Sequence, residues 1–353
     1  MKTTTMLRCA ALGAIAAIAA LASVGAAAAD EITGAGATFP QPVYTRWAEM
    51  YASSGHDTLN YQGIGSGAGV TQIINRTVDF GASDAPVAPE RIASNNLLQF
   101  PAVIGAVVVA ANVPGVDANG LKLTGSLIGD IYLGRVRMWN DPRIRALNPG
   151  LNLPAMAIAP VYRADSSGTS SIFTTYLSSV NLAFSTTIGA GSSVSWRAGI
   201  GAPGNAGVAG AIVNTRGAIG YVEYAYAAEN NMQVVSLQNR SGAWVRPSAA
   251  AFAAAAAQAP WANAPNQAAS MINTAGATSW PIVSATYIEI PTNPADPSRS
   301  LKVLQFFNWA WGNGQSAVDA LHYISLPAQV QNQARARWCQ IRSNGQAVWP
   351  GCH

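Results

Sequence analysis

The sequence predicts an α/β protein built from two lobes. Apolar runs of strand length alternate with amphipathic helical patterns along the chain, which is typical of the α/β class. The chain has 353 residues, more than one hydrophobic core usually spans, so we expect two lobes. Half of the residues are hydrophobic, 10% are charged and 33 are glycine, which favours a compact domain with tight turns over a disordered chain.

The first 29 residues are typical of a cleaved secretory signal. Lys2 and Arg8 form a basic region, residues 9–24 are apolar, and small residues at 27–29 suit a signal peptidase. Cys9 precedes the apolar core, too early for a lipoprotein cysteine, so we expect no lipid anchor. The remaining 324 residues carry 18 basic and 16 acidic side chains, a net charge of +2 that does not indicate a nucleic-acid binder. We therefore expect an exported, soluble protein, and we expect it to be a monomer.

The exported chain begins with a predicted glycine-rich loop, residues 32–40. A helix is expected directly after it, because Pro40 and Pro42 suit a first helical turn, where a missing N–H has no partner to lose. Thr38 and the backbone N–H of Phe39 are placed where they could hold an anion. An ordinary glycine turn is an equally good interpretation of this segment alone.

A second segment has the same arrangement: a predicted strand at residues 59–62, a glycine-rich loop at 63–69 and a helix from Val70. Its glycines fit neither a dinucleotide-binding motif nor a Walker motif. Ser66 is not in the frame of a hydrolase nucleophile elbow, because Ile64 stands where that motif needs glycine. What remains is a loop whose backbone N–H groups and one hydroxyl can face a small ligand.

A short predicted strand follows within residues 78–86 and ends in Ser83 and Asp84. Pro86 disfavours a helical conformation for the residue before it, which ends the element there. An aspartate at such a position usually forms a turn. Asp84 has a further role only if the loops rich in donors converge, since it is then an acceptor among donors.

A third strand-to-helix junction lies at residues 162–171, after an apolar run at 155–161. The positive end of the helix dipole and the unpaired N–H groups of the first turn suit an anion there. Arg163 supplies a fixed fork of donors, and Asp165 is placed to hold that guanidinium. Further hydroxyl donors are Ser166, Ser167 and Thr169. An ordinary helix cap remains an open interpretation of this segment alone.

The rest of the chain continues the alternation. We expect long strands at residues 100–111 and 280–290 that cross between the lobes, and a further strand at 217–222. Residues 135–140 are expected to form a basic and aromatic surface loop, and residues 199–205 another glycine-rich loop. Further helices are predicted at residues 127–133, 249–257, 301–311, 318–323 and 327–338.

Two cysteines, Cys339 and Cys352, lie near the end of the chain. In an oxidising compartment such a pair most simply forms a disulfide that fastens the tail. By the chain-entropy account a loop of this size contributes roughly 2 to 3 kcal/mol. Metal binding is the weaker alternative, because no spacing resembles a zinc site. We expect neither a metal nor a cofactor.

Five segments of this chain together resemble the periplasmic phosphate-binding proteins of ABC phosphate importers. They occur in that family's order and cover nearly all of the exported chain, with the resemblance weakening after Ser325. They are G-A-G-A-T-F-P at residues 34–40, Y-Q-G-I-G-S-G at 61–67, V-D-F-G-A-S-D-A-P at 78–86, R-A-D-S-S-G-T-S at 163–170 and G-A-I-G-Y-V-E-Y-A-Y-A at 217–227.

The resemblance implies a two-lobed periplasmic-binding-protein fold with a ligand cleft between lobes that crossing hinge strands join. We expect residues 1–29 as the signal peptide, 30–105 and 285–353 as the first lobe, and 106–284 as the second. The resemblance places Asp165 as the partner of the arginine in the site. The residues implied to bind phosphate are Thr38, Phe39, Ser66, Asp84, Arg163, Ser167, Gly168 and Thr169.

The implied function is high-affinity binding of inorganic phosphate in the periplasm, without catalysis, and delivery to the membrane permease subunits of an ABC importer. Asp84 is then hypothesised to accept the proton that phosphate carries and sulfate lacks, which makes the site selective. We expect the lobes to close about the ligand. The alternatives are an exported phosphoesterase or other hydrolase that uses Ser66 or Ser167, and a receptor for another tetrahedral oxyanion.

Overall fold

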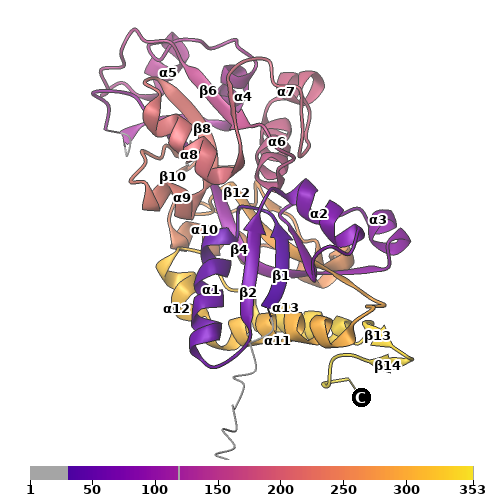
Figure 1. Cartoon of the computed structure of the whole chain (residues 1–353). Helices are drawn as coiled ribbons and strands as arrows, with labels where there is room; N and C mark the ends of the chain where they lie inside the picture. The colour runs from indigo at the N-terminus through magenta and orange to yellow at the C-terminus, as the bar shows by residue number, and fades with distance from the viewer. Residues whose placement is uncertain (1–30, 118–119, 353) are drawn as a thin grey trace, which may run out of the picture.

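The computed structural model describes residues 31–117 and 120–352, so the predicted signal peptide lies outside the described residues. Nine strands form one sheet in the order β2-β1-β3-β12-β4-β8-β6-β7, and β11 pairs with β12. The elements at the two ends of this sheet form two groups, one around β1 and β2 and the other around β6 and β8 (Figure 1). The strands of this sheet are β1 (Glu31–Gly36), β2 (Thr58–Gly63), β3 (Phe80–Ser83), β4 (Leu97–Ala111), β6 (Ala159–Arg163), β7 (Ile200–Ala202), β8 (Ala218–Glu223), β11 (Met271–Ile272) and β12 (Ile282–Pro291).

Helices cover both groups of strands, and short strands form two small sheets beside them. The helices are α1 (Gln41–Ser53), α2 (Ser66–Ile74), α3 (Pro89–Ser94), α4 (Gly125–Tyr132), α5 (Pro142–Leu147), α6 (Gly168–Val180), α7 (Leu182–Thr187), α8 (Gly204–Asn214), α9 (Tyr224–Glu229), α10 (Ala249–Ala256), α11 (Pro297–Asn313), α12 (Gln315–Ala320) and α13 (Ala328–Trp338). The small sheets contain β5 (Lys122–Thr124), β9 (Ser236–Gln238), β10 (Trp244–Val245), β13 (Arg342–Ser343) and β14 (Gln346–Ala347). Among the residues that the structure describes, no helix is both long and apolar enough to cross a lipid bilayer.

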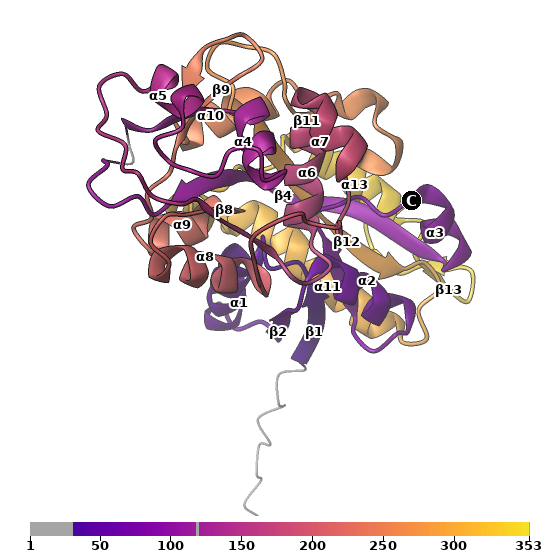
Figure 2. The ribbon, with the colours of Figure 1, turned by 90° about the horizontal axis from the view of Figure 1, so that it is seen from above.

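Strand β4 connects the two groups of elements. All 15 of its residues are buried, as expected for an apolar run of β-branched and small side chains. Its first part pairs antiparallel with β12, up to Ala106, and its last part pairs antiparallel with β8, from Val107 onward. Figure 2 shows β4 and β12 lying side by side through the middle of the molecule. The prediction of long strands at residues 100–111 and 280–290 is confirmed.

The segment at residues 32–40 is not only a loop, because Glu31–Gly36 form β1. Its glycines are needed for close packing inside the sheet. A Cβ on Gly34 would lie 2.2 Å from the ring of Phe80, and one on Gly36, which has φ +149°, would lie 2.0 Å from the carbonyl oxygen of Ala82. Glycine spacing therefore indicated a turn where the structure has a strand pressed against its neighbour.

Helix α2 begins at Ser66, four residues before the predicted start at Val70. Two glycines that suggested a loop, Gly67 and Gly69, lie inside the helix. A Cβ on Gly69 would lie 2.3 Å from the Cα of Gly36, so the residue is small to let α2 approach β1. The early start brings Ser66 to the first turn of the helix.

The predicted surface loop at residues 135–140 is wrong in one respect, because Trp139 is fully buried. Its indole N–H donates to the carbonyl oxygen of Gly217, 2.9 Å away, and so satisfies its polar atom in the core. The predicted glycine-rich loop at 199–205 contains β7 and the start of α8. The apolar run at 155–161 becomes a strand only from Ala159.

The tail after α13 is held by the predicted disulfide between Cys339 and Cys352, whose Cα atoms lie 5.6 Å apart. Trp338, at the end of α13, is fully buried and packs against Trp311 and Trp349. The tail therefore belongs to the group of elements around β1 and β2, where the first and last parts of the chain lie together (Figure 1).

Candidate anion-binding site

One wall of the candidate site is formed at one edge of the sheet by the segments that follow β1, β2 and β3. These strands are parallel, so their carboxyl ends share that edge. Thr38 and Phe39 lie between β1 and α1, Ser66 is the first residue of α2, and Asp84 directly follows β3. All four residues are at most 6% exposed.

The opposite wall is the junction of β6 and α6. Arg163 is the last residue of β6, and Ser167 is the N-cap of α6. The Ser167 hydroxyl accepts a hydrogen bond from the Ser170 backbone N–H, 3.0 Å away, which fixes the first turn of the helix. Gly168 and Thr169 occupy that first turn and are buried. The predicted order of strand, loop and helix start is confirmed here.

The two walls touch each other. The backbone N–H of Gly168 donates to the Ser66 hydroxyl at 3.0 Å, and the backbone N–H of Gly67 donates to the Ser166 carbonyl at 3.1 Å. A Cβ on Gly168 would lie 2.5 Å from Ser66 Oγ and 2.7 Å from Asp84 Cβ. Only glycine therefore allows the helix start to approach Asp84 this closely.

Arg163 is clamped by Asp165, as the sequence predicts. Its Nε donates to Asp165 Oδ1 at 2.8 Å, and its Nη2 donates to Asp165 Oδ2. Burial alone would raise the pKa of Asp165, but the hydrogen bonds and the positive charge of Arg163 lower it below the usual range. Asp165 is therefore ionised near neutral pH, and it fixes the Arg163 guanidinium in the interior, with an arginine side chain 1% exposed.

The hydroxyls that surround Arg163 are saturated as acceptors. Thr169 Oγ1 accepts from Arg163 Nη1 at 3.4 Å and from Asn205 Nδ2 at 3.3 Å. Thr38 Oγ1 accepts from the backbone N–H of Asn205 at 3.1 Å and from its Nδ2 at 2.8 Å. Ser66 Oγ accepts from Gly168 at 3.0 Å and faces the Asp84 N–H at 3.4 Å. Each hydroxyl proton is thus left to be donated to something else.

Asp84, unlike these hydroxyls, lacks a hydrogen-bond donor within the described part of the chain. It is 1% exposed, and neither of its carboxylate oxygens accepts a hydrogen bond from the residues that the structure describes. Burial raises its pKa to about 7, although the Thr286 hydroxyl, the positive charge of Arg163 and the Ser66 hydroxyl each lower the pKa. A buried carboxyl without a donor is costly and uncommon, so its position points to a ligand that supplies a proton.

Asn205 links the two walls through Thr38 and Thr169, and no strong sequence signal identifies it. It is fully buried at the start of α8, and its own Oδ1 accepts from the backbone N–H of Glu223 at 2.9 Å. The pattern at residues 199–205 predicts only a glycine-rich loop. The one signal for Asn205 is that a polar amide ends this segment at the start of a helix.

Two buried tyrosines that the sequence analysis did not single out hold the loop after β1. The Tyr226 hydroxyl donates to the Thr38 carbonyl at 2.6 Å. The Tyr323 hydroxyl lies 2.5 Å from the Phe39 carbonyl and 3.0 Å from Glu223 Oε2. Burial raises the pKa of Glu223 well above its usual value, which favours a neutral carboxyl there.

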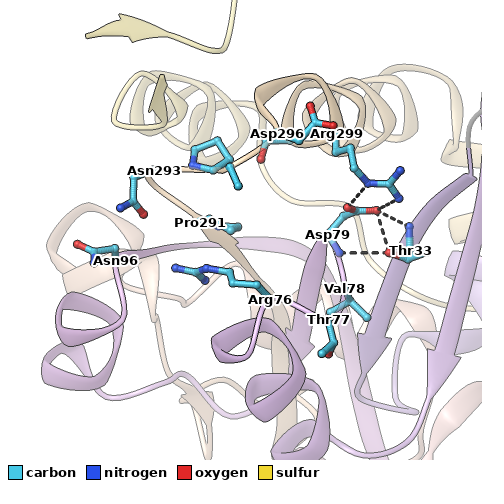
Figure 3. Close-up of a pocket in the computed structure, with 13 residues that line it drawn as sticks. Thr33, Arg76, Thr77, Val78, Asp79, Asn96, Pro291, Asn293, Asp296 and Arg299 are labelled. Atoms are coloured by element: carbon cyan, nitrogen blue, oxygen red, sulfur yellow. Dashed lines mark hydrogen bonds and ion pairs between the residues drawn. The ribbon is translucent and has the colours of Figure 1, made fainter. Parts of the chain in front are cut away.

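A cavity of about 210 Å³ adjoins this site and is lined from both walls, by Thr38 and Gln41 on one side and Asp165, Gly204 and Tyr226 on the other. A larger cavity, of about 590 Å³, lies elsewhere, around the segment before β3 (Figure 3). There Arg299 and Asp79 bind each other: Arg299 Nε donates to Asp79 Oδ1 at 2.6 Å, and Thr33 also contacts Asp79 (Figure 3). The larger cavity therefore does not coincide with the donor-rich site.

Comparisons with known proteins agree with this architecture. A family model described as a PBP superfamily domain matches residues 22–313. The phosphate-binding protein PstS of Pasteurella multocida is 45% identical over 91% of this chain and 94% of that protein. The protein of the same name from Haemophilus influenzae is 44% identical over 88% of this chain and 93% of its own.

Solved structures show the same fold. The crystal structure of a phosphate-binding protein from Stenotrophomonas maltophilia has a TM-score of 0.68, with 21% identity, over 92% of this chain and 96% of that chain. The two-lobed architecture predicted from the sequence is thereby confirmed. The chain therefore belongs to the PBP superfamily and, within it, to the family of the PstS phosphate-binding proteins.

Proposed function

We propose that this chain binds inorganic phosphate between its two walls and delivers it to the membrane permease subunits of an ABC importer. The observation that carries the proposal is the convergence of buried donors around a carboxyl that has no donor of its own. The curated relatives that span nearly the whole chain are named phosphate-binding proteins, which supports the same ligand.

The donors suit a tetrahedral anion. Arg163 provides charge, the start of α6 provides backbone N–H groups and the positive end of its dipole, and Thr38, Ser66 and Thr169 provide hydroxyl protons. The N–H groups of Phe39 and Gly168 and the hydroxyl of Ser167 complete the proposed set, and Gly168 then exchanges its 3.0 Å hydrogen bond to Ser66 Oγ for one to the anion. Each charge-assisted hydrogen bond contributes about 1.5 to 3 kcal/mol.

Asp84 sets the selectivity of the proposed site. Phosphate near neutral pH carries a proton and can donate it to an ionised carboxylate, whereas sulfate has none to donate. With sulfate bound, Asp84 faces an anion without a shared proton in a region of low dielectric, which is repulsive. The donor set attracts any tetrahedral oxyanion, and Asp84 rejects those that are fully deprotonated.

Closure of two lobes is part of the proposal. We assign residues 30–105 and 285–353 to the first lobe and 106–284 to the second, with β4 and β12 as the connection. The change of pairing partner along β4 supports a boundary near residue 106. Phosphate is then expected to shift the molecule toward a more compact form, and small-angle scattering with and without phosphate tests it. An unchanged radius of gyration contradicts hinge closure.

The same proposal places the protein in the periplasm as a monomer that is not an enzyme and binds no nucleic acid. No observation favours a hydrolase: His56 stacks on Tyr51 of α1, and His322 packs against Tyr224 of α9, so each imidazole contacts an aromatic ring. Assay of the pure protein with a chromogenic phosphomonoester checks this point. Sustained turnover contradicts the assignment as a binding protein.

Isothermal titration of protein dialysed free of phosphate is the direct test of the ligand. A ligand of five heavy atoms reaches roughly −7.5 kcal/mol at the usual ceiling per atom, near micromolar, so we expect micromolar affinity or tighter for phosphate. Sulfate and arsenate are titrated in parallel to compare tetrahedral anions. Absence of phosphate binding by the correctly folded protein overturns the proposal, and tight sulfate binding overturns the role of Asp84.

A further inference from the structure

Behind Asp84 lie two more buried hydroxyls that have no hydrogen-bond partner. Thr286, on β12, and Tyr44, on α1, are both 0% exposed. Thr286 Oγ1 and the Tyr44 hydroxyl, like both carboxylate oxygens of Asp84, find no partner of ordinary geometry among the described residues. Three elements thus bring unsatisfied polar groups to one place, which is rare in a protein interior.

The register of the sheet puts Thr286 beside Asp84. In the antiparallel pair of β3 and β12 the last paired residues are Tyr287 and Ser83, and continuing that register by one residue sets Thr286 opposite Asp84. Residues directly opposite each other in such a pair point to the same face. The Thr286 hydroxyl is accordingly a neighbour of the Asp84 carboxyl and also of the Tyr44 hydroxyl.

With Asp84 ionised, the count of donors supports one arrangement of Asp84, Thr286 and Tyr44. An ionised Asp84 can only accept, and Thr286 has a single proton to donate. If Thr286 donates to Asp84, its own oxygen is free to accept, and Tyr44 has a proton to give it. The resulting chain of hydrogen bonds runs from Tyr44 to Thr286 to Asp84 and leaves the second Asp84 oxygen for the ligand.

We propose that Thr286, supported by Tyr44, is a positioning residue that holds Asp84 as the ionised acceptor of the ligand's proton and so sets the selectivity for phosphate over sulfate. The inference rests on the proposed function, because it concerns the same site. It adds that selectivity depends on a hydroxyl that does not touch the ligand. Without that donor Asp84 retains its proton more readily and can itself donate to a fully deprotonated anion.

Several other groups face Asp84, and they belong to other elements. Arg163 lowers the pKa of Asp84. Burial raises the pKa of Glu223 and of Glu289, and the negative charge of Asp84 raises both further. A comparison between variants of Thr286 leaves all of them in place. These groups are Arg163 on β6, Glu223 on β8, Glu289 on β12, Tyr44 on α1, Tyr61 on β2, Tyr226 on α9 and Tyr323 after α12.

Thr286→Val tests the proposal, since valine keeps the shape and removes the hydroxyl. Phosphate and sulfate are titrated calorimetrically at pH values from 5.5 to about 8.5, a range chosen to span one unit and more on each side of the Asp84 pKa of about 7. We expect the acid side of the phosphate profile to move to higher pH and the ratio of phosphate to sulfate affinity to fall about tenfold, as for the loss of one hydrogen bond to a charged group.

Two further variants separate positioning from packing. Thr286→Ser restores the hydroxyl and is expected to recover the wild-type profile, including its ratio of affinities. Thr174→Val removes a buried hydroxyl from α6, where it donates to the Ser170 carbonyl at 2.7 Å, and is expected to leave the pH profile of binding unchanged. If Thr286→Val does not fold, Tyr44→Phe tests the proposal instead. We then expect the acid side of the phosphate-binding profile to move to higher pH by less than in Thr286→Val.

The outcomes distinguish this inference from the proposed function. Wild-type protein that binds no phosphate overturns the proposed function itself. Wild-type protein that binds phosphate, with a Thr286→Val variant that keeps the wild-type pH profile and affinity ratio, overturns the inference alone. Equal weakening of both anions at every pH also overturns it, because a purely structural hydroxyl has that effect. When only Tyr44→Phe can be measured, an unshifted profile overturns the inference.

Discussion

Two aspartates flank strand β3, and the structure treats them in opposite ways. Asp79, before the strand, accepts four hydrogen bonds, two from Thr33 and two from Arg299. Asp84, after the strand, accepts none from the described residues. Asp79 therefore fastens α11 to the start of the sheet, whereas Asp84 is held in an unsatisfied state at its other end.

The two aspartates therefore differ in their hydrogen-bond partners and not in whether they are buried. Both aspartates lie within the same nine-residue motif at 78–86, and both are largely shielded from water, with an Asp79 side chain 11% exposed. A satisfied carboxylate stabilises the fold at the place where it is bound. An unsatisfied one destabilises the fold until a ligand provides the missing donor.

The largest difference between the Asp84 and Asp79 ends of β3 is expected when the arginine near each is replaced by alanine. Arg163→Ala removes charge-assisted bonds to the anion and leaves Asp165 without its cation, so phosphate affinity is expected to fall about a thousandfold or more. Arg299→Ala is the matched control at the Asp79 end and is expected to lower stability with phosphate affinity within about threefold of wild type. Calorimetric titration and urea unfolding measure both. Equal loss of affinity in the two variants contradicts the contrast.

The next largest effect is expected in the pH dependence of folding stability, to which the unsatisfied Asp84 contributes. The pKa of folded Asp84 is about 7, whereas an aspartate in an unfolded chain has a pKa of about 3.9. Between these pH values the phosphate-free folded state therefore keeps a proton that the unfolded state releases. Stability contributed by Asp84 is therefore present at low pH and lost as pH rises toward 7, by up to about 4 kcal/mol.

Urea unfolding of wild type and Asp84→Asn from pH 4.5 to about 8 measures this effect, with the range chosen to cover the titration. The variant is expected to be the more stable protein at pH 7 and above in the absence of phosphate, with the difference shrinking as pH falls. A difference between the two proteins that does not depend on pH shows that Asp84 does not titrate as described.

Exchange of each carboxylate for its amide is expected to have a smaller effect. Asp84→Asn supplies an N–H donor that sulfate can accept, so the ratio of phosphate to sulfate affinity is expected to narrow by about tenfold to a hundredfold. Asp79→Asn loses part of its ion pair with Arg299 and is expected to cost about 1 to 3 kcal/mol of stability while the affinity ratio is kept. Titration of phosphate and sulfate into both variants measures these ratios. A narrowed ratio of phosphate to sulfate affinity in Asp79→Asn contradicts the assignment of selectivity to Asp84 and of stability to Asp79.

The smallest expected effect is that of removing one hydroxyl, on Thr33, from the Asp79 end of β3. Thr33→Val removes the 2.8 Å hydrogen bond from Thr33 Oγ1 to Asp79 but keeps the one from the backbone N–H, so stability is expected to fall by about 1 kcal/mol. Thermal unfolding measures it, and phosphate binding provides the control. Any change in the pH profile of phosphate binding would connect the two ends of β3.

Local sequence signals were sufficient for the parts of the site that lie within one segment. Hydroxyl residues at a helix start, an arginine two residues before an aspartate, and a strand that ends in Ser83 and Asp84 all form as predicted. Each of these arrangements depends on neighbours within a few residues. The disulfide between Cys339 and Cys352 was predictable for the same reason.

The features that the sequence did not reveal depend on distant contacts. Gly34 and Gly36 indicated a loop, but they serve packing against β3, and Trp139 indicated a surface, but its indole reaches Gly217. Asn205 joins the walls only once the start of α8 lies beside Thr38, in the loop after β1. The position of Thr286 follows from the register of β3 and β12, which no local pattern encodes.

The place of β12 in the sheet has a consequence for biosynthesis. β3 pairs with β1 on one side and with β12 on the other, and β12 is completed only at Pro291. While the chain emerges from its amino end, β3 has an open edge of the kind that pairs with other chains. The part of the molecule that is made first therefore keeps this edge of β3 open until β12 has been made.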